Sequence, residues 1–257
     1  MKAKKSYGQH FLKEKSTARR IAESLVHTDT YEEVLEIGPG KGMLTQFLID
    51  RPYQLKAVEA DPDMVAYLAD EFPQLEGRVI FQDVLKLDPT LHFDGQFAVI
   101  GNFPYNISSQ ILFKIVKYRE QIPEMVGMFQ KEVARRVASP PGSKEYGVIS
   151  VLIQAYYEVE YLFSLPPGAF NPPPKVKSGV IRLTRRDNQD LGCDESLFRS
   201  VVKITFGQRR KMLRKTLRSF TKHERLQEDP FFQRRPETLS VEDFIGITKW
   251  LEEVREP

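Results

Sequence analysis

Short apolar runs alternate with helix-patterned segments along the first half of the chain, and this alternation limits the possible folds more than any other feature. The strand-like runs are residues 33–37, 54–60, 79–81, 97–101 and 124–130. The segments with helical periodicity are residues 15–27, 43–49, 62–72 and 108–118. Strands that alternate with helices in this way predict an α/β fold with a mainly parallel, doubly wound sheet.

The pattern changes after residue 130. A helix is predicted near 146–155, and the runs 157–165 and 178–184 predict an antiparallel hairpin at the edge of the sheet. The proline-rich link between these two runs, 166–174, suits neither a helix nor a central strand.

Only helical patterns follow Arg186, after turn and polar residues at 187–194. We therefore expect two domains. The first is an α/β domain over residues 1–186, which begins with a flexible basic arm at 1–14, and the second is a small all-helical domain over 187–257. A chain of 257 residues is long enough to bury a core in such an arrangement.

Cysteine and histidine usage excludes several classes of protein. The single Cys193 rules out an internal disulfide and a thiolate metal cluster. The four histidines lack the spacing of metal ligands, so we expect no metal site. No apolar stretch approaches the length of a membrane span, and the basic N-terminus lacks the apolar core of a signal peptide. We therefore expect a cytoplasmic protein.

Positive charge is concentrated at two places, although the net charge of the chain is only +3. Residues 1–20 carry a net charge of +6 and residues 199–225 carry +9, whereas residues 21–198 carry −8. Two basic segments beside an acidic body predict contact with a polyanion. The alternative for either segment is an ordinary solvated helix face.

A glycine-rich loop, Gly38-Pro39-Gly40-Lys41-Gly42, follows the first strand of the predicted sheet and the acidic Glu36. A dinucleotide fingerprint would place its last glycine where Met43 stands. The loop lets a ligand approach the backbone closely, and its spacing fits S-adenosylmethionine better, because that cofactor has no phosphate to bind. We expect Gly38 and Gly40 to contact this cofactor.

Polar residues stand at the ends of the next three strands, where ligands bind in open α/β sheets. Glu59 ends the second strand, 21 residues after Gly38, and can accept from both ribose hydroxyls. Asp83 follows the third strand and can accept from an adenine amino group, and Asn102 follows the fourth. Each alone has an ordinary explanation as a strand end, cap or turn residue, but their joint spacing predicts a nucleoside-type cofactor site.

Asn102-Phe103-Pro104-Tyr105 combines an amide, a rigid carbonyl-bearing turn and an aromatic ring. The Asn102 side-chain oxygen and the Pro104 carbonyl can accept the hydrogens of a planar exocyclic amine, while Tyr105 stacks on its heterocycle. Two acceptors that pull these hydrogens out of the ring plane localise the nitrogen lone pair for attack. The motif therefore predicts alkylation of an amino group, and the alternative is a simple β-turn.

Five motifs, spread over nearly the whole chain, carry a family resemblance. They are Gly8–Leu12, Val34–Gly42, Asn102–Ser108, Phe170–Ser178 and Phe206–Arg214. In these motifs the chain resembles the small-subunit (16S) ribosomal RNA adenine N6,N6-dimethyltransferases, the family whose loss gives kasugamycin resistance. The resemblance implies a Rossmann-like class I methyltransferase fold with a small helical C-terminal domain. It also implies transfer of four methyl groups, two to each of two adjacent adenines in a loop near the 3′ end of the RNA.

The resemblance further implies which residues contact the cofactor S-adenosylmethionine. The positions that match the family's contacts are His10, Leu12, Gly38, Glu59, Asp83 and Asn102. Three positions depart from the family pattern: His10 stands where Asn is common, Gln82 where Gly often precedes the acid, and Phe103 where Leu or Ile is usual. We expect the first to affect how the N-terminal arm closes over the cofactor, and the other two to be packing changes.

The second basic segment is expected to bind RNA phosphates. We expect the protein to act as a monomer, with immature small ribosomal subunits as its partner. The cations of this basic segment fall in one short predicted helix with a buried stripe at i, i+4 and i+7 from Leu213, so they project outward together. These cations are Arg209, Arg210, Lys211, Arg214, Lys215 and Arg218. We expect a similar role for Lys4, Lys5 and Lys13 in the N-terminal arm.

Several alternatives stay open at this point. Phe170 is expected either to contact the target base or to belong to a rigid hairpin loop. For the whole chain the nearest alternative is a large-subunit adenine methylase of the antibiotic-resistance type, against which the last two motifs argue. A non-catalytic ribosome-assembly or nucleic-acid-binding factor is another, and the intact strand-end residues argue against it. A nicotinamide oxidoreductase is least supported, because the last glycine of its fingerprint is missing.

Overall fold

The structure is a computed structural model that describes residues 9–254; the predicted RNA-binding residues Lys4 and Lys5 lie outside this range. The described chain forms two compact units. The sheet unit contains residues 9–135 and 158–185, and the helical unit contains residues 136–157 and 186–254. The chain therefore passes between the units three times.

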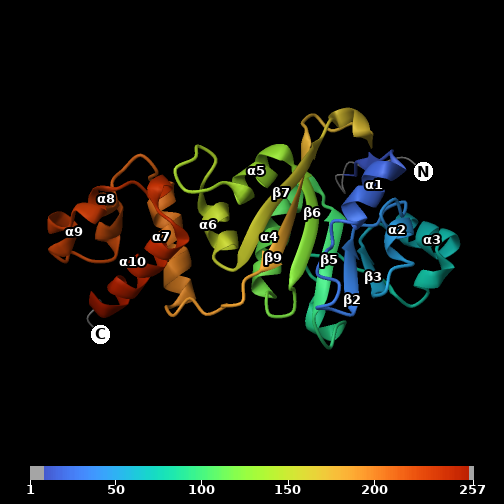
Figure 1. The fold of residues 1–257 in the computed structure, drawn as a ribbon, viewed down its shortest axis with the longest axis horizontal. Helices are drawn as coiled ribbons and strands as arrows, with labels where there is room; N and C mark the ends of the chain where they lie inside the picture. The colour runs from blue at the N-terminus through green and yellow to red at the C-terminus, as the bar shows by residue number, and fades with distance from the viewer. Residues whose placement is uncertain (1–8, 255–257) are drawn as a thin grey trace. The chain divides into compact units, whose positions relative to one another are not determined.

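A seven-stranded sheet forms the centre of the sheet unit, in the order β4-β3-β2-β5-β6-β9-β7 (Figure 1). Its strands are β2 (Glu33–Ile37), β3 (Gln54–Glu59), β4 (Val79–Phe81), β5 (Phe97–Asn102), β6 (Glu124–Gln130), β7 (Tyr157–Leu165) and β9 (Ser178–Arg185). The strands from β2 to β6 pair in parallel, and β9 pairs antiparallel with β6. The Rossmann-like sheet predicted from the sequence is confirmed.

The order of the strands reverses at β2, because β3 and β4 follow on one side and β5 and β6 on the other. In open α/β sheets, ligands bind at such a reversal, outside the carboxyl ends of the strands. The glycine-rich loop follows β2, and Asn102 ends the neighbouring strand β5. The topology therefore brings the predicted site residues to one edge of the sheet.

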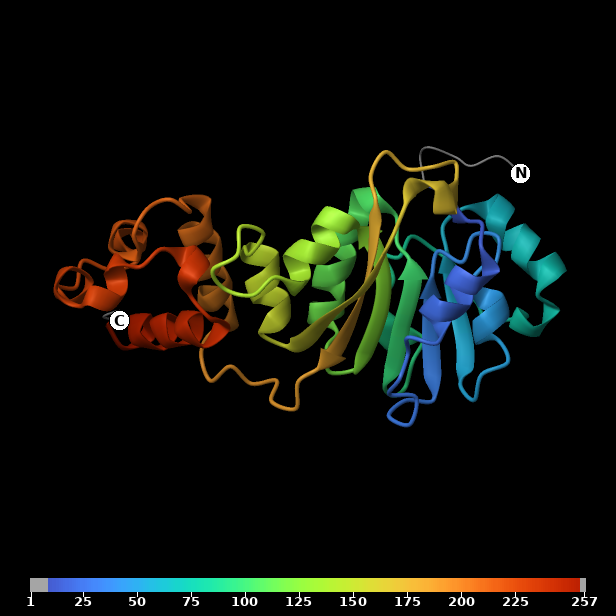
Figure 2. The same ribbon diagram turned by 45° about the horizontal axis from the view of Figure 1, so that its top comes forward.

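Helices cover both faces of the sheet (Figure 2). They are α1 (Lys15–Ala22), α2 (Thr45–Leu48), α3 (Pro62–Glu71), α4 (Ser108–Lys117) and α5 (Lys131–Ala138). The 3-10 helices of this unit are η2 (Pro73–Leu75), η3 (Pro89–Leu91), η4 (Tyr105–Ile107) and η5 (Pro167–Ala169). Helix α5 begins directly after β6 and was not predicted.

Helix α1 ends at Ala22, although its periodicity predicted a helix to residue 27. The cause is Glu124, at the start of β6, whose side chain is fully buried. Its carboxylate accepts from the backbone N–H groups of Val26 and His27, at 3.0 and 3.1 Å, and from the Tyr31 hydroxyl at 2.8 Å. Backbone donors taken by a side chain do not continue a helix.

A second, small sheet joins the N-terminal segment to the proline-rich link. Strand β1 (Phe11–Leu12) pairs antiparallel with β8 (Phe170–Asn171). Leu12 and Phe170 are both buried in the hydrophobic core of the unit. Two-residue strands carry no periodic pattern, so neither was predicted.

The helical unit consists of α6 (Val148–Gln154), α7 (Glu195–Gly207), α8 (Leu213–Thr216), α9 (Arg225–Glu228) and α10 (Val241–Val254), with the 3-10 helices η6 (Leu217–Ser219), η7 (Pro230–Gln233) and η8 (Pro236–Thr238). Residues 136–157, which lie within the first predicted domain, cluster with this unit. The fully buried Tyr146 packs edge to face on Phe206 of α7, with ring centroids 5.9 Å apart. None of the helices in the described part of the chain is long and apolar enough to cross a membrane.

Candidate active site

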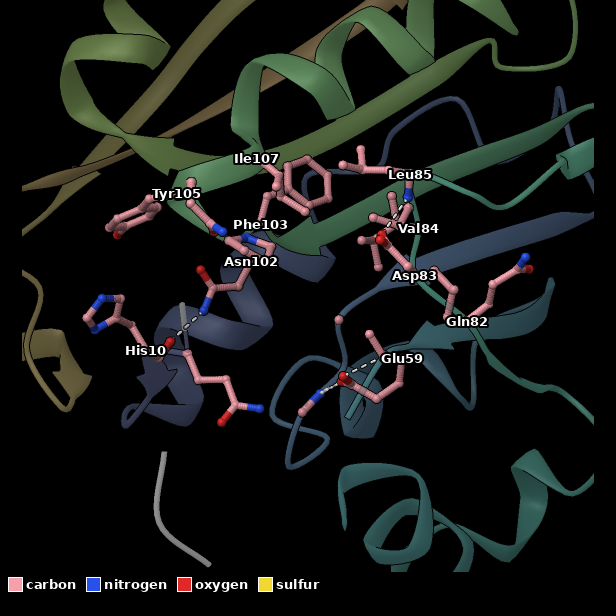
Figure 3. Close-up of a pocket in the computed structure, with 18 of the residues that line it drawn as sticks. His10, Glu59, Gln82, Asp83, Val84, Leu85, Asn102, Phe103, Tyr105 and Ile107 are labelled. Atoms are coloured by element: carbon pink, nitrogen blue, oxygen red, sulfur yellow. Dashed lines mark hydrogen bonds between the residues drawn. The ribbon is translucent and has the colours of Figure 1, made fainter. Parts of the chain in front are cut away.

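A cavity of about 490 Å³ opens at the carboxyl edge of the sheet (Figure 3). This volume is in the usual range for small-molecule sites. Its wall contains eight residues that the sequence predicted: His10, Gly38, Gly40, Glu59, Asp83, Asn102, Pro104 and Tyr105. Residues that were not predicted as site residues also line it, among them Gln9, Phe11, Phe81 and Ile107.

The glycine-rich loop has a backbone that only glycine adopts easily. Gly38, Gly40 and Gly42 have φ angles of 66°, 54° and 73°, in the left-handed region. A Cβ atom on Gly42 would stand 2.2 Å from the Phe72 ring, and one on Gly40 would stand 2.9 Å from the Phe11 ring. The loop therefore needs glycine for conformation at three positions and for space at two.

Glu59 holds the loop from the end of β3. Its buried carboxylate accepts from the backbone N–H of Gly40 at 3.2 Å, and from those of Ala60 and Asp61 at 2.9 Å each. Burial raises the pKa of this carboxyl group. Two carboxylate oxygens offer about four acceptor sites, so acceptor capacity remains toward the cavity, which fits a ribose hydroxyl.

Asp83 lies in the loop after β4. Its Oδ1 accepts from the backbone N–H of Leu85 at 2.9 Å, which leaves Oδ2 as an acceptor for a ligand. Lys114 of α4 holds the same loop, because its Nζ donates to the carbonyls of Leu85, at 3.2 Å, and of Leu87. Desolvation lowers the pKa of Lys114. Lys114 was not predicted as a site residue, because it lies 29 residues from Leu85 and no local pattern links the two.

The Asn102 amide has a fixed orientation. Its Nδ2 donates to the main-chain carbonyl of His10 at 2.7 Å (Figure 3). Only the NH₂ end of the amide can donate to a carbonyl, so Oδ1 is the end presented to the cavity. Asn102 and His10 are 92 residues apart, and the link between them was not predictable from the sequence.

Both the hydroxyl and the ring of Tyr105 have partners in the structure. Its hydroxyl shares a hydrogen bond of 2.5 Å with the Ser178 hydroxyl, and its ring stacks with that of His10 at 5.5 Å between centroids and 30° between planes. Burial raises the pKa of Tyr105. His10 in turn donates from Nδ1 to the Pro172 carbonyl at 2.8 Å. Carbon atoms in contact are about 3.5–4 Å apart, so a base between these rings requires them to separate to about 7 Å.

The turn between Asn102 and Tyr105 offers two backbone carbonyls. The Pro104 carbonyl already accepts from the Ile107 N–H at 3.2 Å and from the Ser108 hydroxyl at 3.3 Å. Among the described residues, none donates to the Phe103 carbonyl. The Phe103 ring is buried, and a Cβ on Gly127 would stand 2.4 Å from it.

Two further predicted residues do not reach the cavity. Leu12 is 4% exposed in the core and does not line the wall. Phe170 is 1% exposed, so in this structure its side chain lies in the core of the unit and not at the cavity. Lys13, beside Leu12, is exposed.

The basic segment of the helical unit is not one helix. Helix α7 ends at Gly207, residues 208–211 form a turn, and α8 and η6 follow. Arg209 is turned inward: its Nη2 donates to the Ser143 carbonyl at 3.1 Å and its Nε lies 3.8 Å from the Glu237 carboxylate. Leu213 and Leu217 are buried as predicted, and Arg214 is half-buried. The cations that are exposed are Arg210, Lys211, Lys215 and Arg218.

The chain is similar to known proteins over nearly its full length. The family model described as ribosomal RNA adenine dimethylase matches residues 1–253. A relative from Parabacteroides distasonis, named ribosomal RNA small subunit methyltransferase A, is 53% identical over 256 residues, 96% of this chain and 93% of the relative. A relative of the same name from Flavobacterium johnsoniae is 51% identical and covers 98% of this chain and 97% of its own.

Solved structures show the same fold. A dimethyladenosine transferase from Plasmodium falciparum superposes with a TM-score of 0.81 at 22% identity, over 95% of this chain and 98% of its own. The 23S rRNA methyltransferase ErmE superposes with a TM-score of 0.68 at 25% identity, over 93% of this chain and 99% of its own.

Proposed function

Because the chain belongs to the ribosomal RNA adenine dimethylase family, we propose that it dimethylates N6 of two adjacent adenines in a loop near the 3′ end of small-subunit ribosomal RNA. Four methyl groups are transferred in total. The observation that carries this proposal is the Asn102 amide, which His10 orients so that Oδ1 faces the cavity shared by Gly38, Glu59 and Asp83.

S-adenosylmethionine is the cofactor of this family, and the cavity fits it. Gly38 leaves the backbone open at the loop, since a Cβ there would meet no atom within 4 Å; Glu59 offers an acceptor for ribose, and Asp83 offers one for the adenine amino group. When bound, this cofactor supplies an electrophilic methyl group on a sulfonium. The protein therefore has mainly to position and polarise the acceptor nitrogen.

Two acceptors are proposed to bind the N6 hydrogens of the target adenine. Asn102 Oδ1 is one, and a carbonyl of the turn that follows is the other. The predicted carbonyl, that of Pro104, already has two donors, so we propose the neighbouring Phe103 carbonyl as the better candidate. Tyr105, fixed by Ser178, supplies a ring on which the base stacks.

The proton leaves N6 after transfer and passes to water, so no described side chain has to act as a strong base. An adenine inside a helix is out of reach of the cavity, so the target base is unstacked or in a loop. The exposed cations of the helical unit and Lys13 bind phosphates of an immature small subunit in the cytoplasm, and the enzyme acts as a monomer.

The test is a methylation assay with labelled S-adenosylmethionine and three substrates: immature small subunits, large subunits and naked ribosomal RNA. The expected result is label on two adjacent adenines of the small-subunit RNA, four methyl groups per subunit. Absence of label from the small subunit contradicts the proposal, and absence of label from all three substrates, with cofactor binding intact, favours a non-catalytic assembly factor.

The fold shared with the 23S rRNA methyltransferase ErmE supports one alternative, a large-subunit methylase. The same assay decides between the two, because that alternative places the label on an adenine of the large-subunit RNA.

A further inference from the structure

The loop tip Lys175-Val176-Lys177 contains an exposed apolar side chain between two exposed cations. Val176 is 45% exposed, although the residues on either side of the tip, Pro174 and Ser178, are buried. Isolated apolar side chains on a surface are common, so exposure alone decides nothing. The position of Val176 beside the active site, in contrast, points to a role in binding.

The loop tip is anchored beside the active site. The Lys177 carbonyl accepts from the backbone N–H of Lys131 at 2.8 Å, and the Pro172 carbonyl accepts from His10 Nδ1. The next residue, Ser178, is the hydrogen-bond partner of the Tyr105 hydroxyl. Two residues of extended chain span at most about 7 Å, so Val176 lies within that distance, between Cα atoms, of the residue that holds Tyr105.

An enzyme that reacts with a base of folded RNA must first take it out of its stack. Nucleic-acid-binding proteins that unstack bases insert apolar side chains such as Ile, Leu or Pro and hold the backbone with cations. Val176 stands between two lysines, two residues before the Ser178 that holds the Tyr105 hydroxyl, so the loop tip offers both kinds of group beside the active site.

We propose that the loop tip binds the RNA strand beside the target adenine. Val176 fills the space that the extruded base leaves, and Lys175 and Lys177 bind the phosphates on either side of it. The inference rests on the proposed function, which supplies the substrate, and names a part of the protein that positions it.

The phosphate contacts are tested by RNA binding at several salt concentrations. Each of Lys175→Gln and Lys177→Gln is expected to lower the slope of log affinity against log salt by about one. Lys117→Gln is the matched control: Lys117 is also exposed, but it ends α4, and its slope should equal that of the unmodified protein. Unchanged slopes for both loop variants overturn the phosphate contacts.

The wedge is tested by single-turnover methylation of immature small subunits at saturating cofactor and enzyme. Val176→Ser is expected to lower the rate about tenfold while affinity for the subunit changes less than twofold, and Val176→Ile is expected to restore the rate. Val26→Ser is the control, because Val26 is 50% exposed in the loop after α1. A rate equal to that of the unmodified protein for Val176→Ser overturns the wedge.

These experiments distinguish failure of the proposed methylation from failure of the proposed loop-tip contacts. If the unmodified protein does not methylate small subunits, the proposed function fails, and the salt slopes still report whether Lys175 and Lys177 contact RNA. If it methylates them and the loop variants match it in slope and rate, only the loop inference fails.

Discussion

Asn102 must do two things with one side chain: donate to the His10 carbonyl and accept from the substrate amine. An alanine removes both. We expect Asn102→Ala to lower the rate of methyl transfer at least 100-fold, since one oriented group at a reacting centre contributes about 2.7–4 kcal/mol. Affinity for S-adenosylmethionine should fall less than tenfold.

Single-turnover methylation and calorimetric titration of the cofactor measure these two effects. Near-normal methylation by Asn102→Ala would refute the role given to Asn102. A loss of cofactor affinity as large as the loss of rate would show that Asn102 acts mainly by binding the cofactor and not the substrate amine.

Glu36 makes stability depend on pH. Its carboxyl group is fully buried, accepts from the Thr45 hydroxyl at 2.7 Å, and has its pKa raised by burial to about 8. Folding therefore favours the protonated form. The stability that this preference contributes is complete below pH 4.5, the usual pKa, and is lost as the pH rises through 8.

We therefore expect Glu36→Gln to reduce the loss of unfolding free energy between pH 5 and pH 8.5. The reduction should be on the order of 4 kcal/mol, because about three of the pKa units between 4.5 and about 8 act within this pH range and one unit corresponds to about 1.4 kcal/mol. Urea unfolding at several pH values measures it, and the exposed Glu71→Gln is the control. Parallel curves for Glu36→Gln and the unmodified protein would show that Glu36 ionises freely in the fold.

Among the elements, the glycine-rich loop allows backbone strain and steric crowding to be measured separately, by comparison of Gly40 with Gly77. Gly40 and Gly77 both have left-handed φ angles, 54° and 72°, but a Cβ on Gly77 meets no atom within 4 Å, whereas one on Gly40 meets the Phe11 ring at 2.9 Å. Both alanine variants should cost about 1–2 kcal/mol of stability through strain. Only Gly40→Ala should also disturb the cavity wall.

We expect Gly40→Ala to weaken cofactor binding about tenfold, which corresponds to about 1.4 kcal/mol. Gly77→Ala should leave it unchanged. Calorimetric titration of both variants measures the difference. Equal affinities would mean that the Phe11 ring moves aside at no cost to the site.

The elements also show what a sequence can and cannot predict. Strand β6 was predicted with its observed bounds, because an apolar run buried on both faces has few alternatives. The end of α1 was not, because it depends on a carboxylate 98 residues from Val26. The same holds for the pairing of β1 with β8 and for the link from His10 to Asn102. The local sequence pattern predicts which segments form helices and strands. Contacts between residues far apart in the sequence decide where those helices and strands end and how the side chains are oriented.

For the molecule as a whole, the sequence shows where the positive charges are concentrated, but it does not show which of these side chains contact other residues of the protein and which are exposed. The segment after α7 was predicted to present all its cations outward. The structure turns Arg209 toward Ser143 and Glu237, and leaves its neighbour Arg210 exposed. Adjacent arginines therefore have different tasks, one in the packing of the helical unit and one on its surface.

This difference gives a paired prediction. Arg210→Gln should lower the slope of log RNA affinity against log salt by about one and leave the melting temperature unchanged. Arg209→Gln should leave the slope unchanged and lower stability by about 1 kcal/mol, the usual net contribution of a hydrogen bond. Salt-dependent RNA binding and thermal unfolding of both variants measure the two effects. If Arg209→Gln changed the slope and Arg210→Gln did not, the inward-turned arginine would be the one that meets the RNA.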